Sequence, residues 1–152
     1  MAFRFSQNAL LRLRATLQQV EERALLRMWQ EARSGEKDLE RAQAVRRDYR
    51  QRRTAPPPGA PLLGADLQFS DFVDAHLAGD EERMRQRLAA KQREVQTQLA
   101  VFREARRRRE VIEALRDREL RTHREGELRR EQRALDDAYL MQLLLPGRQT
   151  RG

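Results

Sequence analysis

The sequence predicts an all-α protein: two long helices forming an antiparallel coiled-coil hairpin, with an overhanging C-terminal helix. Three observations indicate this fold. Charged residues make up 37% of the 152 residues, and the mean hydropathy of −0.92 is too low for a compact globular core. Apolar residues recur at steps of three and four along most of the chain. Proline and glycine are concentrated in one short stretch, residues 56–64, between the two helical patterns.

The first helix is expected over residues 6–53, with Ser6 placed to accept hydrogen bonds from the first free amides. Its apolar stripe predicts a seam against one partner helix. The stripe contains Leu10, Leu13, Leu17, Val20, Ala24, Met28, Ala32, Leu39, Ala42, Val45 and Tyr49. Three successive steps of four from Val20 to Ala32 predict a local relaxation of the supercoil. Ser34-Gly35 is the predicted weak point of this helix.

The proline-rich stretch, residues 54–69, allows two interpretations: a linker between separate domains, or the tip of one hairpin. Separate domains would leave each helix with an unburied apolar stripe, whereas a hairpin buries both stripes. Charge also supports the hairpin, because arginines crowd the end of the first helix and acids crowd the start of the second. Pairing Arg53 with Asp71 sets the register, in which the numbers of facing residues sum to about 124.

The second helix is expected over residues 70–145, followed by a tail at 146–152, and residues 1–152 are predicted to form a single hairpin domain. Its stripe includes Phe72, Val73, Leu77, Met84, Leu88, Val95, Leu99, Phe102, Ile112, Leu115, Leu128, Leu135 and Tyr139. Lys91, Arg109 and Arg116 interrupt the seam. In the predicted register, roughly the last 25 residues of this helix extend beyond the first helix. Their apolar stripe therefore needs a partner.

Several classes of function find no support in the sequence. The chain has no cysteine for disulfides or thiolate metal sites, and no apolar run of 18 residues that would predict a membrane span. Residues 1–20 have the composition of an organelle transit peptide, but their periodicity continues unbroken into the first helix. His76 beside Asp74 is a weak candidate for a ligand pair, and no nucleophile has a base nearby. We therefore predict a protein that is not an enzyme and has no cofactor or metal.

Basic residues are a candidate binding feature. Four arginines stand in succession, Arg106, Arg107, Arg108 and Arg109, and the pI of about 11.1 is typical of nucleic-acid-binding proteins. Consecutive arginines point around the whole helix, however, and acids flank them, so a solvated face with ion pairs within the helix is the simpler interpretation. In the predicted register they lie within about a turn of Arg12 and Arg14. These six arginines, the basic collar, predict an acidic partner surface.

Both ends of the chain are similar to a known family. The start, MAFRFSQNALLRLRATLQQVEERAL, contains Phe3-Arg4-Phe5 followed by Leu10-Leu11-Arg12-Leu13-Arg14. The C-terminal stretch RREQRALDDAYLMQL contains Asp136-Asp137. These elements resemble the Phe-x-Phe opening, the helix start and the Arg/Glu-rich end of the flagellar type III export protein FliJ family. The length and the longer second helix also match, so the resemblance covers nearly the whole chain.

The resemblance implies a coiled coil similar to the central stalk of rotary ATPases, in the cytoplasm at the inner-membrane export apparatus. Its terminal end would enter the hexameric flagellar export ATPase, and its tip would contact the cytoplasmic linker of the export gate's large subunit. It would also help to recycle export chaperones. The residues expected at the gate are Tyr49, Phe72, Val73 and Leu77. Those expected in the ATPase ring are Leu128, Leu135, Tyr139 and Leu143, together with the basic collar.

Three other functions stay open at the level of the sequence. The chain could be the related stalk protein of a virulence type III secretion system, although the Phe-x-Phe start favours the flagellar one. It could also be a nucleic-acid-binding coiled coil, or a structural dimer or filament. The apolar residues near the tip, among them Leu62, Leu63 and Phe69, either close the hairpin on itself or form a docking patch.

Overall fold

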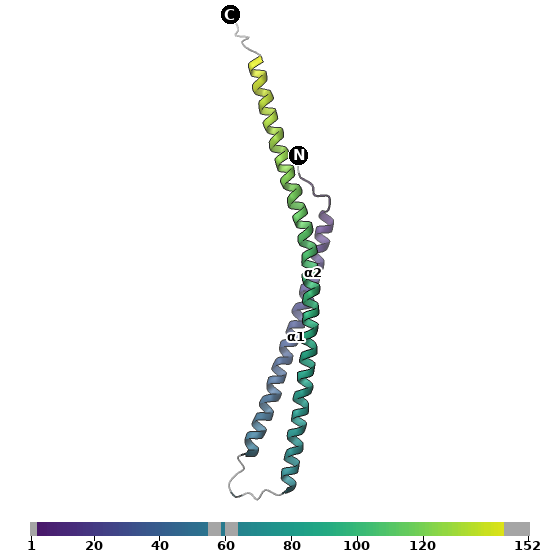
Figure 1. Ribbon diagram of the computed structural model, residues 1–152, viewed down its shortest axis with the longest axis vertical. Coiled ribbons are helices and arrows are strands. Elements are labelled where there is room, and N and C mark those ends of the chain that lie inside the picture. The colour runs from purple at the N-terminus through teal and green to yellow at the C-terminus, as the bar shows by residue number, and fades with distance from the viewer. Residues whose placement is uncertain (1–2, 55–58, 60–63, 145–152) are drawn as a thin grey trace, which may run out of the picture. The chain divides into compact units, whose positions relative to one another are not determined.

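The computed structural model describes residues 3–54, 59 and 64–144, which contain two long helices, α1 (Asn8–Thr54) and α2 (Gly64–Leu144). The helices pack against each other as an antiparallel hairpin, so the all-α hairpin is confirmed (Figure 1). The proline run Pro56–Pro58, the tip residues Leu62 and Leu63, and the predicted tail at 146–152 lie outside the described residues.

The first helix begins two residues later than predicted. α1 starts at Asn8 rather than at Ser6, because residues 5–8 form a turn in which the Asn8 amide donates to the Phe5 carbonyl at 3.3 Å. The next hydrogen bond, from the Leu11 amide to the Gln7 carbonyl at 3.0 Å, has the i to i−4 spacing of an α-helix. Helical structure then continues through Ser34-Gly35, the predicted weak point.

The second helix begins earlier than predicted, at Gly64 rather than near Ser70. The next proline after Pro61 is Pro146, so none blocks helical hydrogen bonding in between, and Asp66 places a negative charge in the first turn, where the helix dipole favours it. α2 then runs without interruption to Leu144, through both of its interior glycines.

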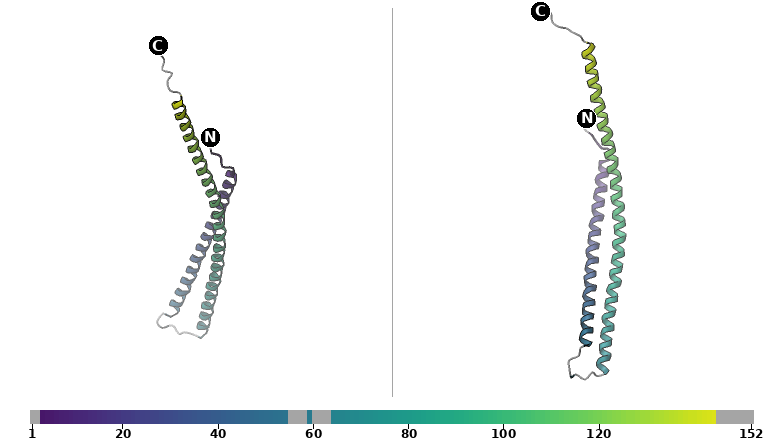
Figure 2. Two further views of the ribbon diagram at one scale, coloured as in Figure 1. Left: turned by 45° about the horizontal axis from the view of Figure 1, so that its top comes forward. Right: turned by 60° about the vertical axis from the view of Figure 1, so that its left-hand side comes forward.

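The chain divides into two compact units, which are described separately. The hairpin unit is residues 17–105 and contains most of α1 with the first half of α2. The terminal unit combines residues 1–16 with residues 106–152. Within the hairpin unit, α1 and α2 run side by side in opposite directions in both views of Figure 2.

A strict heptad seam joins the two helices of the hairpin unit. The seam positions, all of them buried or half-buried, alternate by steps of three and four on each helix, as a left-handed coiled coil requires. On α1 they are Gln18, Glu21, Leu25, Met28, Ala32, Gly35, Leu39, Ala42, Arg46 and Tyr49. On α2 they are Ser70, Asp74, Leu77, Glu81, Met84, Leu88, Lys91, Val95, Gln98 and Phe102. Leu25, Ala32 and Val95 form its buried core.

This seam corrects the apolar stripe that the sequence predicts for the first helix. Leu17 and Val20 are 40% and 51% exposed, and Gln18 and Glu21 occupy the seam instead. The relaxation of the supercoil predicted between Val20 and Ala32 is therefore wrong, since the alternation of three and four continues through this segment. The physical reason is geometric: a supercoil keeps one set of heptad positions facing the partner helix, whichever side chains occupy them.

Polar seam residues find partners across the hairpin. The Gln98 amide Nε2 donates to the Glu21 carboxylate at 2.6 Å and to the Glu21 backbone carbonyl at 3.3 Å. The Lys91 ammonium donates to the Glu31 carboxylate at 2.8 Å. This contact with Lys91 lowers the pKa of Glu31. Pairing limits the cost of removing these polar groups from water, whereas the buried Oε1 of Gln18 has no hydrogen-bond partner among the described residues.

The predicted register is confirmed by the ion pair from which it was inferred. Arg53 Nη2 lies 2.6 Å from Asp71 Oδ1. Other contacts along the hairpin unit join residues whose numbers sum to between 119, for Tyr49 with Ser70, and 127, for Arg46 with Glu81. These values bracket the expected 124, so complementary charge at the two helix ends predicts which residues face each other.

In the terminal unit, the residues that precede α1 pack on α2. The ring of Phe3 contacts the ring of His123 edge to face, with centroids 5.6 Å apart. Leu11 is buried, and α2 keeps half-buried positions at heptad spacing as far as His123. From Leu128 to Leu144, by contrast, every residue of α2 is exposed.

Gly35 offers a test of the seam. A Cβ at this position would lie 3.5 Å from Leu88 Cδ1, an ordinary van der Waals contact. We expect Gly35→Ala to raise the free energy of unfolding by about 1 kcal/mol, because alanine restricts the unfolded chain and favours the helix. Chemical denaturation followed by circular dichroism measures this change, with Ser34→Ala at the exposed neighbouring position as the control. A less stable Gly35→Ala protein would show that Gly35 does not face Leu88 across the seam.

Candidate partner-binding site

The end of α1 and the start of α2 are joined by a network of ion pairs around Arg46. Its Nε lies 3.1 Å from Asp74 Oδ1, and its Nη1 lies 3.1 Å from Glu81 Oε2. Arg50 binds the same Asp74 carboxylate through two nitrogens, each at 2.9 Å. The side chains of Arg46, Asp74 and Glu81 are mostly withdrawn from solvent, so this network is part of the seam.

The network changes the acidity of its carboxylates. Hydrogen bonds from Arg50 and then from Arg46 hold the pKa of Asp74 well below its usual range. A hydrogen bond from Arg46 is the largest of the effects that lower the pKa of Glu81. The same contacts raise the pKa of Arg46 and Arg50. All four groups are therefore held in their charged forms.

Tyr49 is expected at the export gate, but in the structure its hydroxyl bonds across the hairpin to the start of α2. Its hydroxyl lies 3.1 Å from the carbonyl oxygen of Ser70 and 3.0 Å from the Ser70 hydroxyl. Its side chain is half-buried in the seam. Among the other residues expected at the gate, Val73 and Leu77 are also half-buried.

Phe72 is the residue expected at the gate that is exposed, and Phe69, one of the apolar tip residues considered from the sequence, is exposed beside it. Their exposed fractions are 68% and 69%. The two rings are three residues apart, so they lie on one face of α2. We call these two residues the tip patch. Of the two alternatives left open from the sequence for Phe69, closing the hairpin or forming a docking patch, its exposure favours the docking patch.

His76 does not form the ligand pair considered from the sequence. Its Nε2 lies 3.6 Å from Asp80 Oδ2, whereas the Asp74 carboxylate is occupied by Arg46 and Arg50. Among the described residues, no group of three or more His, Cys, Asp or Glu side chains is arranged to hold a metal ion.

The last turns of α2 carry a second apolar surface. Leu128, Leu135, Tyr139 and Leu143 are each more than half exposed. Steps of seven and four place these four residues on one face of the helix. We call them the terminal stripe. Leu140, Met141 and Leu144 are also exposed in this segment, which makes the end of α2 unusually apolar for a helix surrounded by water.

The basic collar is partly neutralised within α2. Arg106 Nε lies 2.7 Å from Glu110, and Arg109 Nη2 lies 3.1 Å from Glu113. The interpretation as ion pairs within the helix is therefore confirmed for these two arginines. Arg12, Arg107 and Arg108 are exposed, and Arg14 is half-buried.

Neither of the two described helices contains a stretch both long and apolar enough to cross a bilayer.

Acid should weaken the hairpin through Asp74 and Glu81. Because folding lowers both pKa values, their contribution to stability is complete above their ordinary values, at pH ~5 and higher, and is lost as the pH falls through the native pKa values. We expect the melting temperature to fall as the pH is lowered from about 5 to about 2, because carboxylates become protonated in this range. Asp74→Asn with Glu81→Gln should lower the melting temperature at pH 7 and flatten this dependence. Glu94→Gln, at an exposed position, is the control, and an unchanged slope in the double variant would contradict the assignment.

The comparisons with known proteins identify the family. A search of curated proteins and a search of solved structures returned no match. The family model described as flagellar FliJ protein matches residues 4–148, which is nearly the whole chain and both helices of the hairpin. The resemblance inferred from the two ends of the sequence is thereby confirmed, and the chain belongs to the FliJ family of proteins associated with flagellar export.

Proposed function

We propose that this protein is a non-enzymatic, stalk-like component of the flagellar export apparatus that connects the export ATPase with the export gate. One end of the hairpin would bind the hexameric ATPase ring, and the other would bind the cytoplasmic linker of the gate's large subunit. Its place would be the cytoplasmic side of the inner membrane, where it would also support the recycling of export chaperones. Membership of the FliJ family supports the association with export.

The observation that carries the proposal is the terminal stripe. Leu128, Leu135, Tyr139 and Leu143 stand on a helix that is exposed at every residue from Leu128 to Leu144. Exposed apolar side chains on one helix face favour insertion among other helices or into an apolar channel. The overhang predicted from the sequence would therefore be the part that enters the ATPase ring.

The basic collar would bind acidic residues at the entrance of the ATPase ring. Arg12 and Arg107 are exposed and suited to an acidic rim, whereas Arg106 and Arg109 already have carboxylate partners. Exposed ion pairs contribute less than ~1 kcal/mol each and are screened by salt. The collar would thus orient the helix, and the terminal stripe would supply most of the affinity.

The tip patch would serve the gate contact. Phe69 and Phe72 expose large rings close to the turn, next to the ion pairs that hold the two helix ends together. Aromatic side chains with low conformational freedom are frequent anchors of interfaces. Tyr49 would act indirectly, because its bond to Ser70 fixes the start of α2 on which both rings stand.

The test is ATP hydrolysis by the export ATPase of the same organism, titrated with this protein at near-physiological salt. We expect stimulation that saturates at about one chain per six ATPase subunits, as a single stalk in a hexameric ring requires. Leu135→Asp with Tyr139→Asp should abolish the stimulation, because two charges enter the apolar contact. The circular dichroism of this variant should stay close to that of the wild type, since both side chains are exposed.

Ala134→Asp with Met141→Asp is the matched control. It adds the same charge seven residues apart in the same segment, but both positions lie away from the terminal stripe. Stimulation should survive in this control. An active ATPase that does not respond to the wild-type chain at any ratio would contradict the proposed function, as would equal losses in both double variants.

A further inference from the structure

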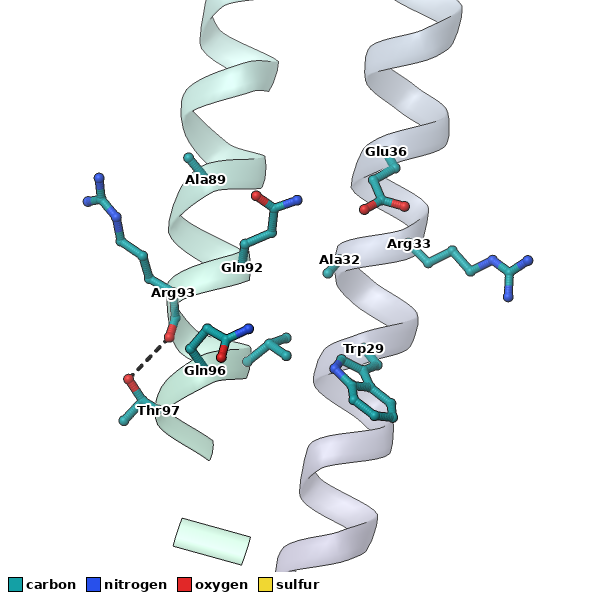
Figure 3. Close-up of a pocket in the computed structure, with 10 residues that line it drawn as sticks. Trp29, Ala32, Arg33, Glu36, Ala89, Gln92, Arg93, Gln96 and Thr97 are labelled. Atoms are coloured by element: carbon teal, nitrogen blue, oxygen red, sulfur yellow. Dashed lines mark hydrogen bonds between the residues drawn. The ribbon is translucent and has the colours of Figure 1, made fainter. Parts of the chain in front are cut away.

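An open groove of about 990 Å³ runs between α1 and α2 within the hairpin unit. Ala32 and Val95, both buried, form its floor. The small side chains of Ala32 and Ala89 keep the groove wide, and Gln92 extends from α2 toward α1, on which Trp29 lies (Figure 3). The groove belongs to neither the terminal stripe nor the tip patch.

Trp29 is the most conspicuous residue of the groove. Its side chain is 49% exposed, and its indole N–H has no hydrogen-bond partner among the described residues. Tryptophan gains more from burial than most side chains and still requires an acceptor for its N–H. It is also enriched among the residues that contribute most of the energy at interfaces. Such an indole at the edge of a coiled-coil seam is a preformed anchor for another chain.

Positive charge without a partner flanks the groove. Arg33 on α1 and Arg93 on α2 make no ion pair with any described residue, and Figure 3 shows them extending outward on opposite sides. Glu36 is the one acid among the residues that line the groove. The other groove of the hairpin differs, because it contains Glu31 and Asp38 and is bridged by the bond from Lys91 to Glu31.

The shape of the groove suits a helix. Two helices joined by a heptad seam leave grooves beside the seam into which a third helix packs with apolar residues at steps of three and four. Residues flanking such a stripe on the incoming helix would then lie near Arg33 and Arg93, and carboxylates at those positions would complete the ion pairs. A second copy of this chain is a poor occupant because its net charge is +8 and its Asp74 and Glu81 are already bound by Arg46.

We propose that this groove binds an acidic amphipathic helix of a partner protein, with apolar side chains against Trp29 and Val95 and carboxylates on Arg33 and Arg93. The site is independent of the proposed contacts with the ATPase and the gate. The hairpin would thus hold a third partner along its length while its two ends remain available.

Trp29 is the single tryptophan of the chain, so its fluorescence reports on this groove alone. The probe is a synthetic helix of three heptads without tryptophan, with leucine at the seam positions and glutamate at the flanking positions, added to the full-length chain. We expect a saturable blue shift of the emission that weakens as salt is raised. Arg33→Glu with Arg93→Glu should weaken binding about tenfold, since two attractive contacts become repulsive.

Two controls show whether a loss of binding comes from the changed charge or from a change in folding. Arg33→Lys with Arg93→Lys keeps both charges and should retain most of the affinity, and Arg87→Glu, in the other groove, should leave it unchanged. Circular dichroism verifies that each variant is folded. Equal binding of a peptide with lysine at the flanking positions, or unchanged affinity of the Arg33→Glu and Arg93→Glu variant, would overturn the proposal. A blue shift that grows with the concentration of the chain alone would instead assign the groove to a second copy.

Discussion

Two carboxylates of α2, Asp74 and Glu81, share the guanidinium of Arg46, and this contact fixes which residues of the two helices face each other. The apolar part of the hairpin unit is thin, since Leu25, Ala32, Leu88 and Val95 are its only buried side chains among the described residues. Apolar seams of small and flexible residues slide easily between registers one heptad apart. Buried polar partners oppose such a slip, because it would leave charges unpaired away from water.

This way of holding the hairpin together has a functional consequence. The seam contains polar residues such as Glu21 and Arg46, which pair with residues of α2, while large apolar residues such as Trp29, Phe72 and Leu135 lie on the surface. Surfaces of this kind are interaction sites in most proteins that carry them. In the proposed function, these separate surfaces of the hairpin are the contacts with separate components of the export apparatus.

Most of the correct predictions about the fold came from the charge distribution and the composition of the sequence. The opposite charges at the two helix ends predicted that Arg53 pairs with Asp71, and this pair defined the register. The predicted stripe of α1 failed at Leu17 and Val20, because they are more apolar than their neighbours Gln18 and Glu21, and only the partner helix reveals the acceptable pairing of Glu21 with Gln98. At the candidate site, the periodicity placed Phe72 in the apolar stripe of the second helix, and the structure shows it exposed. The bond from Tyr49 to Ser70 was not predicted, because it depends on how the two helix ends meet in space.

Cysteine cross-linking tests the register most directly, since the chain contains no cysteine of its own. Glu21 and Gln98 are in direct contact, so cysteines at these two positions should form an intramolecular disulfide upon mild oxidation. Cysteines at Glu21 and Lys91 represent a slip of one heptad, about 10 Å along the helix, and should remain reduced. Efficient cross-linking of the first pair alone is the predicted result. Equal cross-linking of both pairs would show that the polar seam does not fix the register.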